Sequence, residues 1–61
     1  MKFIWTQRAV DKHSKGGSDP MHTISAPNIA DVYDGYVRQL RTGTPWILVD
    51  ASGQIVSQGA A

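Results

Sequence analysis

The chain has no cysteine and no glutamate among its 61 residues, and it has no long apolar run. Without cysteine it can form neither a disulfide bond nor a thiolate metal site. The longest strictly apolar run, Trp46–Val49, is far shorter than the roughly 20 residues that span a membrane. Polar side chains interrupt the N-terminus, which lacks the apolar stretch of a signal peptide. These absences favour a cytoplasmic protein that binds no membrane.

Charge of either sign is also scarce, because charged residues make up 18% of the chain and its formal net charge is +1. Hydrophobic residues make up 41%, which is too many for a disordered polar tail. A chain of this length forms one domain over residues 1–61, and it buries only about 60% of the surface that it exposes when unfolded. Its core is therefore small, and a partner chain is one way to complete it.

Residues 2–10 are rich in β-branched and aromatic side chains, which predicts a strand. Side chains alternate between the two faces of a strand. In this strand Phe3 and Trp5 point to one face, while Ile4 and Val10 point to the other. Both faces of the predicted strand are therefore apolar.

Residues 11–20 contain no large apolar side chain, and they include two consecutive glycines and the pair Asp19-Pro20. Such residues are typical of turns and loops, so we expect an exposed loop there. Residues 21–25 then predict a short strand, although five residues carry little pattern.

A helix is predicted over residues 29–41, where apolar side chains recur with a helical period. Asn28 is a suitable N-cap, and Gly43 can adopt the left-handed conformation that ends a helix. Gly35 lies inside this helix, which is explained either by an exposed position or by the close approach of another backbone. The apolar face consists of Ile29, Val32, Tyr33, Tyr36, Val37 and Leu40.

A hairpin is expected in the last third of the chain, with strands at 46–49 and 54–58 joined by a turn at 50–53. This turn begins with aspartate and ends with glycine, which are the residues that a type I turn with a bulge favours. Residues 59–61 follow the second strand and are expected to be a frayed tail.

In the register set by this turn, Val49 pairs with Ile55 and Leu48 pairs with Val56. The predicted element order is strand, loop, strand, helix, strand and strand. We therefore expect an α+β fold in which a single helix packs on a mostly antiparallel sheet of three or four strands.

A single helix covers one face of such a sheet, yet the strands are apolar on both faces. The residues expected under the helix are Phe3, Trp5, Ile47, Val49 and Ile55. The opposite face would then expose a contiguous apolar patch, which usually marks an interaction site. Isolated exposed apolar residues are common, so the alternative is that Trp46 simply laps over a sheet edge. The residues of the expected protein-binding patch are Ile4, Trp46, Leu48 and Val56.

We interpret this patch as a binding surface for another protein or for a second copy of the chain. The leading hypothesis is a small non-enzymatic protein-binding module, an inhibitor or adaptor that acts as a homodimer by occupying a surface. Small free-standing chains of this kind are often encoded by phages and other mobile elements.

Side chains suited to catalysis or metal binding are few. His13 falls in the expected loop and His22 in the short strand, and the five aspartates fall at turn, cap or helix-surface positions. A metal site made by His13, His22 and Asp19 would have three ligands at a spacing that matches no common pattern. We therefore expect no enzyme activity, no metal and no cofactor.

The alternative hypothesis is a nucleic-acid-binding protein. Residues 1–20 contain four basic and two acidic side chains, whereas residues 21–61 contain two basic and three acidic ones. Basic side chains beside an aromatic ring can bind a phosphate backbone and stack a base. The pI of about 8.2 is below the value of about 9 that is typical of dedicated nucleic-acid-binding domains. The residues that would form this site are Trp5, Arg8, Lys12 and Lys15.

Overall fold

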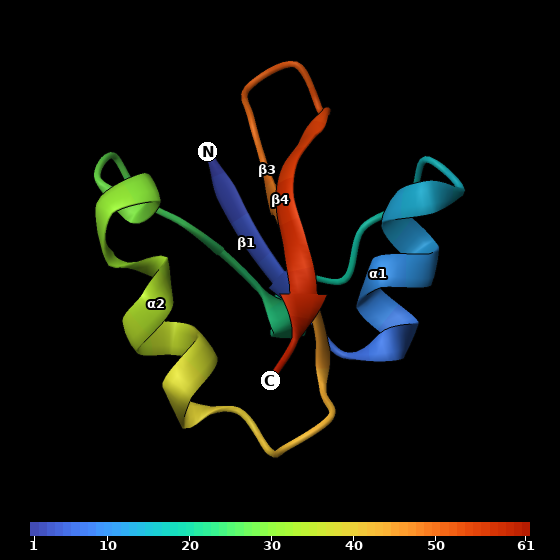
Figure 1. The fold of residues 1–61 in the computed structure, drawn as a ribbon. Coiled ribbons are helices and arrows are strands. Elements are labelled where there is room, and N and C mark those ends of the chain that lie inside the picture. The colour runs from blue at the N-terminus through green and yellow to red at the C-terminus, as the bar shows by residue number, and fades with distance from the viewer.

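The computed structural model describes residues 1–61 and contains one antiparallel sheet with an α-helix on each face (Figure 1). The elements are β1 (Lys2–Trp5), α1 (Gln7–Ser14), the short 3-10 helix η1 (Pro20–His22), β2 (Thr23–Ser25), α2 (Ile29–Gln39), β3 (Pro45–Val49) and β4 (Ile55–Ala60). The strand order is β2-β1-β3-β4. The predicted α+β class and antiparallel sheet are confirmed. Neither α-helix has the length and apolar character needed to cross a membrane.

The unexpected helix, α1, replaces part of the predicted strand at 2–10 and part of the predicted loop at 11–20. β1 ends at Trp5, and Thr6 then turns the chain with a φ of +80°. The Thr6 hydroxyl accepts a hydrogen bond from the Ala9 amide at 3.2 Å, which caps the helix. Only Ala9 is fully buried in this helix, and so short an apolar pattern fits a strand as well as a helix.

Two contacts hold the C-terminal end of α1. The Gly17 amide donates to the Lys12 carbonyl oxygen at 2.8 Å, and the neighbouring Gly16 has a φ of +82°, which suits glycine. His13 Nε2 donates to the Gly53 carbonyl oxygen at 3.1 Å, which joins the helix to the turn between β3 and β4. These contacts fix α1 along the sheet, where the sequence pattern favours a free loop.

The helix predicted at 29–41 is α2, and its position is confirmed. Asn28 occupies the N-cap position as predicted, although its side chain makes no capping hydrogen bond. The helix ends at Gln39, and the backbone of Leu40 is already extended. Gly43 has left-handed backbone as predicted, with a φ of +89°, but it belongs to the turn that follows and does not end the helix.

Gly35 lies on the exposed side of α2, and a Cβ atom added there would meet no atom within 4 Å. Exposure therefore explains this glycine, and close approach of another backbone does not.

Gly35→Ala should raise the free energy of unfolding by about 0.5–1 kcal/mol, because glycine is the poorer helix former. Urea denaturation followed by circular dichroism would measure this, and an unchanged or lower stability would contradict it. Gly53→Ala is the contrasting variant: Gly53 has a φ of +89°, so alanine there should destabilise.

The hairpin of β3 and β4 follows the predicted register only next to its turn. Val49 lies opposite Ile55 as predicted, whereas Leu48 lies opposite Ser57. Val56 is the extra residue of a β-bulge at this point. The predicted pairing of Leu48 with Val56 is therefore wrong by one residue.

The turn of this hairpin is held by the Asp50 carboxylate. Its Oδ1 accepts hydrogen bonds from the Ser52 hydroxyl at 2.6 Å, the Ser52 amide at 2.9 Å and the Gln54 amide at 3.0 Å. These bonds, above all the one from the Ser52 hydroxyl, lower the pKa of Asp50 below its ordinary value. The predicted turn at 50–53 is thus confirmed, with aspartate as its organising residue.

The predicted frayed tail at residues 59–61 is wrong, because all three residues are held by the sheet and the turn beside it. β4 runs to Ala60, and the Ala61 amide then donates to the Thr44 carbonyl oxygen at 2.9 Å. Gly59 lies opposite Trp46, and a Cβ atom on Gly59 would come within 3.2 Å of the indole ring. The absence of a side chain at Gly59 therefore lets the Trp46 ring lie against the strand.

The core is divided between the two faces of the sheet. β1 and β3 pair so that Phe3 lies opposite Leu48 and Ile4 lies opposite Ile47, and paired residues share a face. The cluster under α2 is Phe3, Ile29, Trp46 and Leu48, and the cluster under α1 is Ile4, Ala9, Ile47 and Val49. The predicted grouping of Phe3 with Ile47 is therefore wrong, because alternation within each strand does not determine how two distant strands pair.

Candidate protein-binding surfaces

Three of the four residues predicted to form the protein-binding patch are buried by the chain itself. Ile4 is 4% exposed, Trp46 9% and Leu48 3%, and only Val56 lies at the surface, at 52%. Nor do they share a face, because Ile4 packs under α1 whereas Trp46 and Leu48 pack under α2. These four residues therefore do not form an exposed patch.

The reason is that α1 covers the sheet face that a one-helix fold would leave bare. Figure 1 shows α1 and α2 on opposite sides of the strands. Ala9 is 1% exposed and belongs to the same cluster as Ile47 and Val49, and Val10 packs against that cluster. The chain thus fills both faces with its own residues, so its candidate surfaces lie at the sheet edges and on the outer sides of the helices.

β4 forms one open edge of the sheet, because β3 is its only neighbour. It contains no charged residue and no proline, which are two of the features that prevent an edge strand from pairing with another chain, and its bulge at Val56 is the one such feature it has. Ile55 and Val56 are large hydrophobic residues with 43% and 52% exposure. β4 is therefore an open edge that carries two exposed apolar side chains beside its bulge.

The alternation of hydrogen bonds identifies the backbone groups of β4 that face away from β3. The Ala61 amide donates to Thr44, so Ala61 faces the sheet. Every second residue of an antiparallel strand bonds to the same neighbour, so Gly59 also faces β3. Gln58 and Ala60 then direct their amide and carbonyl groups outward. This edge offers two donors and two acceptors at a spacing that fits another strand.

A cavity of about 230 Å³ lies near the opposite edge of the sheet, between α2 and the strands β1 and β2. Aromatic rings meet there: the Phe3 ring centroid is 5.9 Å from that of Trp5 and 5.6 Å from that of Tyr36. The cavity is mostly apolar, since five of its six lining residues are hydrophobic. The lining consists of Phe3, Trp5, Ile24, Tyr36, Gln39 and Leu40.

The one buried charged side chain is Asp19, which is 7% exposed. Its carboxylate accepts hydrogen bonds from His22 Nδ1 at 3.1 Å and from the Met21 amide at 3.2 Å, and Arg8 Nε lies 3.9 Å away. The His22 ring in turn meets Trp5 edge-on, with ring centroids 5.7 Å apart. Asp19 therefore anchors the segment that leads into β2, and His22 borders the aromatic cluster.

The hydrogen bond from His22, followed by that from the Met21 amide, lowers the pKa of Asp19 despite burial. A carboxylate with a lowered folded-state pKa stabilises the fold above its unfolded pKa of about 3.9, and that stability is lost as the pH falls through the folded value. Asp19→Asn should therefore lower the melting temperature at pH 7, with a difference that shrinks toward pH 2. Thermal melts across this range would test it, and a difference that does not depend on pH would contradict it.

The three residues considered for a metal site do not come together. His22 and Asp19 are hydrogen-bonded to each other, but His13 binds the Gly53 carbonyl oxygen at the far end of α1. No group of three or more histidine, aspartate, glutamate or cysteine side chains in the structure could hold a metal ion.

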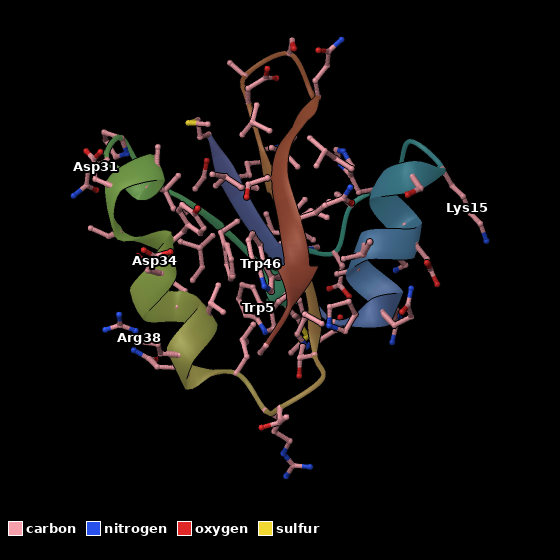
Figure 2. All side chains as sticks on the ribbon, in the orientation of Figure 1. Trp5, Lys15, Asp31, Asp34, Arg38 and Trp46 are labelled. Atoms are coloured by element: carbon pink, nitrogen blue, oxygen red, sulfur yellow. The ribbon has the colours of Figure 1, made fainter.

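Three of the residues predicted for nucleic-acid binding lie together, two on α1 and Lys15 at its C-cap. Arg8, Lys12 and Lys15 are spaced by four and three residues, which places them on one helix face. The Arg8 side chain is 74% exposed, and Lys15 projects from the end of the helix (Figure 2). Trp5 is not beside them, because it packs under α2 against Phe3. The structure thus brings the basic residues together and separates them from the aromatic ring.

Comparison with protein-family models, with curated proteins and with solved structures finds no match to this chain.

Proposed function

We propose that the protein is a small non-enzymatic protein-binding module whose docking surface is the open edge of β4, and that it forms a homodimer there. The observation that carries this proposal is the combination of an open edge strand that has no charge and no proline with two exposed apolar side chains at Ile55 and Val56. An extended segment that pairs with this edge gains main-chain hydrogen bonds, which is a common mode of protein recognition.

A second copy fits this edge in an antiparallel arrangement with a twofold axis at Gln58. The outward groups of Gln58 then bond to Gln58 of the other copy, and those of Ala60 lie opposite Val56. On the neighbouring positions Ser57 faces Gly59, and both are small. No charged side chain of β4 meets its own copy, so self-pairing brings no like-charge repulsion.

The dimer that results is a weak one. A strand of six residues is a small contact beside the about 800 Å² that each partner buries in a standard stable interface. The two sheets would join into one sheet of eight strands with β2 at both ends. We therefore expect dissociation at low protein concentration, and any other extended segment would compete for the same edge.

Single-cysteine variants test this arrangement cleanly, because the chain has no cysteine of its own. Residues that face each other in a hydrogen-bonded pair have Cα atoms about 5.5 Å apart, within the range that a disulfide spans. Gln58→Cys should therefore form a covalent dimer under mild oxidation. In Ser57→Cys the two cysteines are offset by two residues, about 7–8 Å apart, so this matched variant should stay uncrosslinked.

Equal crosslinking of the two variants would contradict the twofold pairing, since random collision would then explain both. Sedimentation equilibrium gives the independent measurement. The unmodified chain should show a monomer–dimer equilibrium, and a chain synthesised with an N-methyl group on the Gln58 amide should be a monomer. This change removes one outward donor and leaves every side chain in place.

The basic face of α1 supports a second candidate, binding of a nucleic-acid backbone. Arg8, Lys12 and Lys15 share this face. Arg8 and Lys12 also lie near the Asp19 carboxylate, and their positive charges offset the repulsion between that carboxylate and a phosphate group.

If duplex DNA binds through three such contacts, log K should fall with log salt with a slope of about −0.9 per contact. Fluorescence anisotropy in a salt series would test this, and Lys12→Gln with Lys15→Gln should reduce the slope. Absence of binding at low salt would exclude this candidate.

A further inference from the structure

The connection between β1 and α1 is a single residue, Thr6, and its backbone is strained. β1 ends at Trp5 and α1 begins at Gln7. Thr6 has a φ of +80° and a ψ of 147°, close to a region that essentially only glycine occupies. A positive φ is especially unfavourable for a β-branched side chain such as threonine. Every other residue with a positive φ in the structure is a glycine.

The local sequence favours a different conformation at Thr6. Residues 2–10 are rich in β-branched and aromatic side chains, which favour an extended chain through this position. Two hydrogen bonds hold the strained turn instead: the Thr6 amide donates to the Pro45 carbonyl oxygen at 3.0 Å, and the Val10 amide donates to the Thr6 carbonyl oxygen at 3.0 Å. The first bond ties Thr6 to the sheet and the second ties it to α1. Its surroundings therefore impose a backbone that threonine itself disfavours.

We propose that Thr6 is a hinge through which two copies of the chain exchange residues 1–5. In the exchanged dimer, β1 of each copy lies between β2 and β3 of the other copy, and α1 stays on the sheet of its own chain. Thr6 is then extended in both copies and is no longer strained. A short connection under strain favours such an exchange. This dimer is distinct from the pairing at the β4 edge and does not depend on it.

A second copy is the partner because it offers β1 the same two neighbouring strands that β1 leaves. Phe3 and Ile4 of β1 are buried, and β1 pairs with both β2 and β3. Exchange rebuilds these contacts in the other copy, so no new surface has to be complementary. Rotation about the Thr6 backbone moves its amide with β1 and its carbonyl group with α1, so both hydrogen bonds of Thr6 can persist. Relief of strain at two residues then offsets the cost of association.

The exchanged dimer forms and dissociates only as fast as the chain unfolds. β1 has a neighbouring strand on each side, so it leaves the sheet only when the core opens. Exchange therefore takes place during refolding at high protein concentration, and dilution reverses it at the rate of unfolding. The dimer at the β4 edge, in contrast, dissociates directly on dilution. An exchanged dimer also presents two β4 edges, and this consequence alone rests on the proposed function.

Lys2→Cys with Ser25→Cys detects the exchange. Lys2 of β1 lies opposite Ser25 of β2, and both residues are exposed. Paired residues have Cα atoms about 4.5–5.5 Å apart, which a disulfide can span. The disulfide lies within one chain in the monomer and joins two chains in the exchanged dimer. After refolding at about 1 mM protein and oxidation, a denaturing gel without reductant should show a covalent dimer well above the level given by Lys2→Cys alone. Refolding at about a hundredfold lower concentration should give the intrachain disulfide.

Thr6→Gly in this two-cysteine chain tests the role of strain. Glycine adopts a φ of +80° without strain and is a tolerable N-cap, so the covalent dimer should fall at least about tenfold. Thr42→Gly is the matched control, because Thr42 is exposed in a turn and has no positive φ, and it should leave the dimer fraction unchanged. The N-methyl group on the Gln58 amide should also leave it unchanged, which separates this dimer from the one at β4. The proposal is overturned by a covalent dimer no more abundant than that of Lys2→Cys alone, or by equal dimer fractions with threonine and glycine at position 6.

Discussion

Phe3→Ala should leave most molecules unfolded at 25 °C. Phe3 is fully buried at the centre of the α2 face, and its ring meets Trp5, Tyr36 and Trp46 with centroids less than 6 Å apart. Removal of a buried phenylalanine ring costs about 3–5 kcal/mol, because apolar burial is lost and a cavity remains. A core in a chain below about 70 residues rarely supplies more than about 3–5 kcal/mol of stability. The expected loss is therefore as large as the whole free energy of unfolding that such a core supplies.

Circular dichroism and the dispersion of NMR amide signals would measure this outcome. Met21→Ala is the matched control, because Met21 is 82% exposed and its truncation should change stability by less than about 0.5 kcal/mol. If Phe3→Ala melted within a few degrees of the unmodified chain, Phe3 would not be the centre of the core described above.

Ala9→Lys is the second change with a large expected effect, and it tests whether α1 covers the second face of the sheet. Ala9 is 1% exposed and packs with Ile4 and Ile47. A lysine there must either bury its ammonium group, which costs several kcal/mol, or lift α1 from the sheet. We expect unfolding, or a partly folded chain that binds an apolar dye through its uncovered face.

Gln7→Lys is the control for this variant, because Gln7 is exposed on the same helix and a lysine there can still reach Asp11 four residues on. It adds the same charge and should leave the melting temperature nearly unchanged. Equal stability of the Ala9 and Gln7 variants would mean that α1 does not pack on the sheet in solution, and that the second face is open after all.

The elements that the sequence predicts well are those with a long or distinctive pattern. α2 has five apolar positions at helical spacing, and the turn that Asp50 organises has the residues that its geometry requires. α1 is different: it has eight residues and a single fully buried side chain, Ala9, and its N-cap Thr6 stands within a run of β-branched and aromatic residues. Local pattern cannot separate a strand from a helix there, because packing on the sheet decides between them.

That one error explains why the predicted binding patch was misplaced. A single helix would cover one face of the sheet and leave the apolar side chains of the other face exposed. With a helix on each face, Ile4, Trp46 and Leu48 are all buried in the core. The open edge at β4 depends on strand order, which is set by the pairing of β1 with β3 over more than 40 residues of chain. No short-range pattern predicts that order. Of the four residues predicted to form the protein-binding patch, only Val56 is exposed, and it lies in the bulge of the edge strand.

The pairing of β4 with a second copy is most directly measured by amide hydrogen exchange as a function of protein concentration. Gln58 and Ala60 direct their amides outward, whereas the Gly59 amide faces β3 and serves as an internal reference within the same strand. We predict that exchange at Gln58 and Ala60 slows as the concentration rises and that Gly59 stays protected throughout. Fast exchange at Gln58 and Ala60 at every concentration, beside a protected Gly59, would contradict the dimer edge.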